Sequence, residues 1–68
     1  MVPVDVIQLI EEAIENEKMA AERYRQGAQA ADDPETRTLF EQLVRWEEDH
    51  ERILHERLTT LKLIRGQQ

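Results

Sequence analysis

The chain has 68 residues, 15 of them acidic and 9 basic, and its formal net charge is -6. A body this small is at most one domain and is marginally stable without a staple or a partner, and the absence of cysteine excludes disulfides, thiolate zinc sites and iron–sulfur ligation. The acidic balance argues against nucleic-acid binding, which needs a basic surface, and no apolar run is long enough to span a bilayer.

The first predicted element is a helix over about residues 6–31. Asp5 is expected to cap it, and Gln8, three residues later, to complete a capping box. Apolar residues then recur at alternating steps of three and four, as on the buried face of a helix. The positions of this seam are Ile7, Ile10, Ile14, Glu17, Ala21, Tyr24, Ala28 and Ala31. Glu17 is therefore the one acidic residue on a face that must be buried.

A turn is predicted at residues 32–33, followed by a second helix over about residues 34–65. Asp33 can cap this helix, Pro34 suits its first position, and Glu35 favours the positive end of the helix dipole. By the same stepping, the second seam consists of Phe40, Leu43, Glu47, His50, Leu54, Arg57, Leu61 and Ile64, with Leu58 beside Arg57. Its polar interruptions halfway along are Glu47 and His50.

The short turn makes the two helices an antiparallel hairpin, in which residues equally distant from the turn lie at the same height. Averaging the position of Glu17 with the midpoint of Glu47 and His50 gives a point inside the turn, so these three residues should face one another. The predicted fold class is thus all-α: residues 1–68 form a single half-domain that dimerises into a four-helix bundle.

The three facing residues indicate a metal site. Glu47 and His50 are three apart on one helix, so both side chains can converge on one ion. A buried carboxylate is costly unless it is paired, protonated or metal-bound, and carboxylate with imidazole suits iron, manganese or zinc. A twofold dimer doubles the set to four Glu and two His, the ligand count of a di-iron carboxylate centre. Two Fe²⁺ ions would also neutralise four carboxylates.

The same residues carry a family resemblance. They are Glu17 and Tyr24, the segment Asp32–Glu35, Phe40, and the segment Glu47–His50. Over about residues 10–58 the chain resembles the rubrerythrin and ferritin-like superfamily. The short spacing between Glu17 and Glu47, in a chain with one hairpin, is most similar to the encapsulated ferritins, whose dimers form the iron site across a subunit interface.

The resemblance implies a ferroxidase that oxidises Fe²⁺ with O₂ or peroxide and serves iron storage. Glu17 and His50 would be terminal ligands, Glu47 would bridge the two irons of a dimer, and Tyr24 would hydrogen-bond beside them. It further implies a homodimer or an oligomer of dimers in the cytoplasm, with an encapsulin shell as a further candidate partner and compartment. Manganese or zinc could substitute for iron.

Other interpretations stay open at this point. Glu17, Glu47 and His50 could instead be a polar layer that sets the register of a metal-free helical dimerisation or scaffold module. Rubrerythrin-like peroxide reduction is a further alternative, disfavoured by the lack of a cysteine-bound electron donor. Tyr24 could be an ordinary core residue, and Trp46, beside the seam, is interpreted as an interface anchor.

Overall fold

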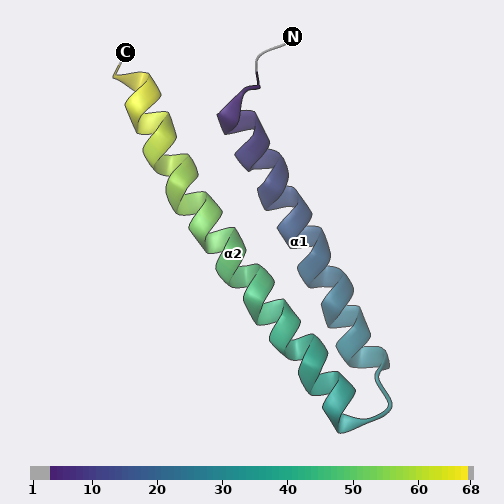
Figure 1. Cartoon of the computed structure of the whole chain (residues 1–68). Helices are drawn as coiled ribbons and strands as arrows, with labels where there is room; N and C mark the ends of the chain where they lie inside the picture. The colour runs from purple at the N-terminus through teal and green to yellow at the C-terminus, as the bar shows by residue number, and fades with distance from the viewer. Residues whose placement is uncertain (1–3, 68) are drawn as a thin grey trace.

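The computed structural model describes residues 4–67 and consists of two helices, α1 (Val6–Ala30) and α2 (Pro34–Gly66). Figure 1 shows them side by side, with the start of α1 and the end of α2 at the same end of the molecule. The expected all-α helical hairpin is confirmed. The turn between the helices occupies residues 31–33, so it begins one residue earlier than the sequence predicted.

Asp5 caps α1 as expected, but the side chain of Gln8 does not take part in the cap. The Oδ1 atom of Asp5 accepts hydrogen bonds from the backbone N–H groups of Ile7 at 3.0 Å and Gln8 at 3.4 Å. The side chain of Gln8 does not return a bond to Asp5, because its amide donates to Glu12, one turn further on, at 3.2 Å. The prediction of a reciprocal capping box is therefore wrong. The Gln8 N–H, helped by the Arg65 guanidinium, holds the pKa of Asp5 below its usual value.

The cap of α2 is formed by the predicted residues. Asp33 lies in extended backbone and its Oδ2 accepts the Thr36 N–H at 2.8 Å, while Pro34 occupies the first turn and Glu35 adds a negative charge there. This bond from Thr36 lowers the pKa of Asp33. Such a cap satisfies backbone N–H groups of the first helical turn that have no partner within the helix. The start of α2 is therefore stabilised by a residue of the turn itself.

The buried line of α1 consists of Ile7, Ile14 and Ala21, spaced by seven residues. These side chains face α2 and are the buried core within residues 4–67. The line of α2 that faces them is only half-buried. It contains Phe40, Leu43, Val44, Glu47, Glu51, Leu54, Leu58 and Leu61.

Within the single hairpin, α1 covers only part of the predicted seam of α2. His50, Arg57 and Ile64 are exposed, whereas Glu51 and Leu58, which follow the first two, are half-buried. Two helices in contact bury a single line on each, so a residue one position away from that line turns toward solvent. The stepping by three and four placed these residues on the correct side of α2 but not on the line of contact.

The hairpin is one layer of helices, measuring 53 × 26 × 12 Å. Its broad faces are uncovered, and the large apolar side chains of Leu39, Trp46 and Ile53 are each about half exposed along one side of α2. Because these residues recur every seven positions, with His50 between the last two, they form one stripe. We call this side of the hairpin the open face. No helix within residues 4–67 is long and apolar enough to cross a bilayer.

Candidate metal centre

The antiparallel register brings Glu17 of α1 to the same height as Glu47 and His50 of α2. One ligand atom from each of the three side chains lies within 4.8 Å of the other two. Within residues 4–67 this is the one group of three or more His, Asp or Glu side chains that converges in this way. The chain is rich in acidic residues, so the convergence of these three singles them out.

Only 24% of the Glu17 side chain is accessible to solvent. Its Oε2 atom is fully buried and accepts no hydrogen bond. Nδ1 of His50 lies 3.6 Å from this oxygen, which is beyond hydrogen-bonding distance. Leaving a buried acceptor unsatisfied costs about 1–3 kcal/mol, and more for a charged group. A bound cation would satisfy this atom, so the Glu17 carboxylate fits a metal ligand.

Glu47 and His50 are less enclosed than the sequence predicted. Glu47 is half-buried, whereas 57% of the His50 side chain is exposed on the open face. Within a single hairpin, therefore, His50 is not buried, and its expected burial between two copies stays a prediction. A single layer of two helices has nothing to cover that position, so its imidazole is accessible to another chain or to an ion.

The donor set suits a first-row divalent metal. Carboxylate oxygens and imidazole nitrogen are ligands of iron, manganese and zinc. One hairpin offers two carboxylates and one imidazole, which leaves coordination positions of any of these ions unfilled. The centre is therefore half of a larger site or a weak, open one.

Tyr24 lies toward the turn from Glu17 and is half-buried. Its ring packs against Phe40 of α2, with the ring centroids 6.3 Å apart and the ring planes at 34°. This distance is typical of a favourable aromatic pair. The structure thus gives Tyr24 the packing of a core residue while leaving it on the same face of α1 as Glu17.

Two residues of interest were missed at the level of the sequence. Glu51 is half-buried, and its Oε2 lies 3.7 Å from Nε2 of His55, which is exposed. The spacing of four from Glu47 places Glu51 near the same line of α2 and could have revealed it. The other is Gly27, which lies against the Phe40 ring. No sequence signal distinguishes it from an ordinary glycine.

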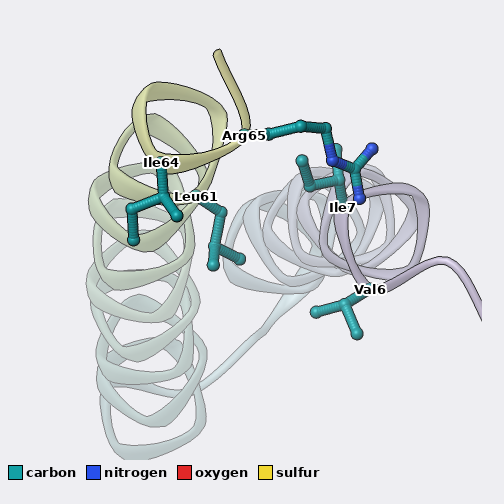
Figure 2. Close-up of a pocket in the computed structure, with 5 residues that line it drawn as sticks. All are labelled: Val6, Ile7, Leu61, Ile64 and Arg65. Carbon is teal, nitrogen blue, oxygen red and sulfur yellow. The ribbon is translucent and has the colours of Figure 1, made fainter. Parts of the chain in front are cut away.

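The cavity at the open end of the hairpin is separate from this centre. Figure 2 shows it, about 210 Å³ in volume, between the first turn of α1 and the last turns of α2. Its lining residues are Val6, Ile7, Leu61, Ile64 and Arg65. The Arg65 guanidinium extends toward α1, where it donates to Asp5 at 3.4 Å. The cavity is mostly apolar and its one cation is already paired, so it adds no ligand to the centre.

Comparison with known proteins assigns the chain to a family. The family model of the ferritin-like domain matches residues 2–64, nearly the whole chain. No curated protein and no solved structure matches the chain significantly. A two-helix hairpin with two carboxylates and an imidazole halfway along it agrees with half of a ferritin-like bundle. The chain belongs to the ferritin-like domain family.

Proposed function

We propose that the protein is a ferroxidase whose iron site forms between two copies of the hairpin. The observation that carries this proposal is the buried Oε2 atom of Glu17, which lacks a hydrogen bond and belongs to the side chain that converges with Glu47 and His50. A carboxylate atom in that position is destabilising in the isolated hairpin and stabilising once a cation binds. Membership of the ferritin-like family supports iron as the metal.

Each residue has a distinct role in this proposal. Glu17 and His50, which come from different helices, hold an iron ion from two sides of the hairpin. Glu47 would be the carboxylate shared between the two copies, holding iron from each of them. Tyr24 supplies a hydrogen bond to a ligand, an interaction that orients ligands and tunes metal affinity.

Iron is the substrate of the proposed reaction. Two Fe²⁺ ions give up one electron each, and O₂ takes these two electrons with two protons to form hydrogen peroxide. The protein binds the two ions close together, balances their charge with four carboxylates and shelters them from water. Carboxylates favour the product Fe³⁺, because a higher charge binds anionic oxygen ligands more strongly.

A second copy of the chain is the proposed partner. The open face exposes Leu39, Trp46 and Ile53 beside His50, and burying such a stripe would stabilise a dimer. The same pairing would bring the second pair of carboxylates and the second imidazole to the site. With two Fe²⁺ ions the four carboxylates are neutralised, which makes the closed site much less costly to bury. Larger oligomers, cytoplasmic localisation and an encapsulin shell stay predictions.

The test is an anaerobic Fe²⁺ titration of chelator-stripped protein, with native mass spectrometry, followed by measurement of O₂ uptake. One iron per chain, bound in dimers, and O₂ uptake that Glu47→Ala abolishes are the expected results. Asp49→Asn is the matched control, because it removes an exposed acidic residue two positions from Glu47 and should leave both readings unchanged.

The alternatives predict different results. A metal-free scaffold module would form stable dimers that bind no iron. Iron binding without O₂ uptake, but with turnover of peroxide and a reductant, would indicate peroxide reduction. Tight zinc or manganese binding that Fe²⁺ cannot displace would indicate a structural metal site. Each of these outcomes contradicts the ferroxidase proposal.

A further inference from the structure

Gly27 lies directly against the ring of Phe40. A Cβ atom built on Gly27 would lie 2.7, 2.8 and 2.9 Å from Cε1, Cδ1 and Cζ of that ring. Carbon atoms in contact are normally about 3.5–4.0 Å apart, so any other residue at position 27 would displace the ring. Phe40 can occupy its position only because Gly27 has no side chain.

The backbone does not explain this glycine. It lies within α1, and no residue among positions 4–67 has a positive φ. A glycine in a helix interior is less favourable than alanine by roughly 1 kcal/mol. No turn or left-handed conformation requires a glycine here. The close approach of the Phe40 ring is therefore the structural reason for a glycine at position 27.

The seated Phe40 ring is also the packing partner of Tyr24. The two ring centroids are 6.3 Å apart, and Tyr24 precedes Gly27 by three residues, so both contact Phe40 from the same side of α1. A ring displaced from Gly27 would lose this arrangement. Three residues therefore form one unit near the turn, which we call the Gly27 clamp: Gly27, Phe40 and Tyr24.

The clamp lies on the turn side of the proposed iron site. Tyr24 follows Glu17 by seven residues, and Phe40 precedes Glu47 by seven, so each pair shares a helix face about 10 Å apart along the axis. Cα–Cβ bonds tilt toward the N-terminus of their own helix. Because the helices are antiparallel, the bonds of Tyr24 and Glu47 tilt toward each other. These tilts favour an orientation of the phenol toward the Glu47 carboxylate.

We propose that Gly27 is a positioning residue for the site: its missing side chain seats Phe40, and the seated ring holds the Tyr24 phenol toward Glu47. The effect on iron rests on the proposed function, whereas the effect on Tyr24 does not. The chain has one Tyr, one Phe and one Trp, so the ring signals of each can be assigned without ambiguity.

The first arm of the experiment follows the aromatic rings by NMR in Gly27→Ala. The ring-proton resonances of Tyr24 and Phe40 are expected to shift. Gly66→Ala is the matched control, because a Cβ at Gly66 meets nothing within 4 Å, and it should leave both rings unchanged. Unshifted Tyr24 resonances in Gly27→Ala would overturn the proposal, whether or not the wild type binds iron.

The second arm measures Fe²⁺ affinity without oxygen. Gly27→Ala and Tyr24→Phe are each expected to weaken binding about tenfold, the low end for loss of a ligand's hydrogen-bond partner. The double variant should be no weaker than either single variant, because both changes remove the same hydrogen bond. Additive losses would show that Gly27 acts on the fold alone and would refute its positioning role.

A third variant keeps the proposal testable if Gly27→Ala does not fold. Phe40→Leu retains Gly27 and a full apolar side chain but removes the ring on which Tyr24 packs. It should shift the Tyr24 resonances and weaken Fe²⁺ binding to the same extent. If the wild type binds no Fe²⁺, the ferroxidase proposal is refuted. The Tyr24 resonances alone then test whether Gly27 and Phe40 position the Tyr24 ring.

Discussion

Replacing Glu17 with leucine should stabilise the metal-free protein. The substitution removes a carboxylate whose Oε2 is buried without a hydrogen bond and replaces it with an apolar side chain at the helix contact. Relieving an unsatisfied buried acceptor is worth about 2 kcal/mol, which for a domain of this size corresponds to a rise in Tm of the order of 10 °C. The measurement is thermal unfolding by circular dichroism in chelator, at one protein concentration.

Bound Fe²⁺ should make the wild type more stable than Glu17→Leu, the opposite of the order expected in chelator. A ligand at one hundred times its Kd stabilises the protein that binds it by about 2.7 kcal/mol. In anaerobic Fe²⁺ the wild type should gain this stabilisation, while Glu17→Leu, which lacks one of the three ligands, should gain little. The variant would then be the more stable protein in chelator and the less stable one in Fe²⁺.

The control is Glu12→Leu, which replaces an exposed acidic residue of α1. It should change the free energy of unfolding by less than about 0.5 kcal/mol in either condition. An equal Fe²⁺-induced rise in Tm for wild type and Glu17→Leu would refute the assignment of Glu17 as a ligand. A lower Tm for Glu17→Leu in chelator would refute the claim that its carboxylate is destabilising.

Three further predictions follow from the fold. Ile14→Ala, at a side chain only 4% exposed, should cost about 2–4 kcal/mol in urea unfolding, and a loss below 1 kcal/mol would mean that α1 and α2 do not pack here. Asp33→Ala should lower the Tm at neutral pH by removing the acceptor of the Thr36 N–H. The folded state lowers the pKa of Asp33 from 3.8. The contribution of its carboxylate to folding stability is therefore complete above pH 3.8 and is lost as the pH falls through the lower, folded-state pKa. The wild type's advantage in Tm should therefore shrink only in acid, and an advantage that fades near neutral pH would contradict this origin. Trp46→Ala should weaken self-association by about 2 kcal/mol in sedimentation equilibrium, whereas Met19→Ala, equally exposed on α1, should not; equal effects would show that Trp46 is not an interface anchor.

Local sequence determined the two helices and their turn. Asp5 and Asp33 mark the helix starts because their carboxylates accept backbone N–H groups that a helix leaves free. Pro34 cannot continue α1 and fits the start of α2. The turn then sets the antiparallel register, which is why the meeting of Glu17 with Glu47 and His50 could be predicted by counting.

The line of contact between the helices could not be read from the sequence. Stepping by three and four approximates a helical period of 3.6, so it cannot decide between neighbours such as His50 and Glu51, which differ by 100° around α2. The position of α1 decides, and it leaves His50 exposed and Glu51 half-buried. In the same way, only the packed structure shows that Gly27 lies against the Phe40 ring and that one oxygen of Glu17 has no hydrogen-bond partner. These features depend on distances between residues far apart in the chain, whereas caps, turns and register depend on residues that are close in sequence.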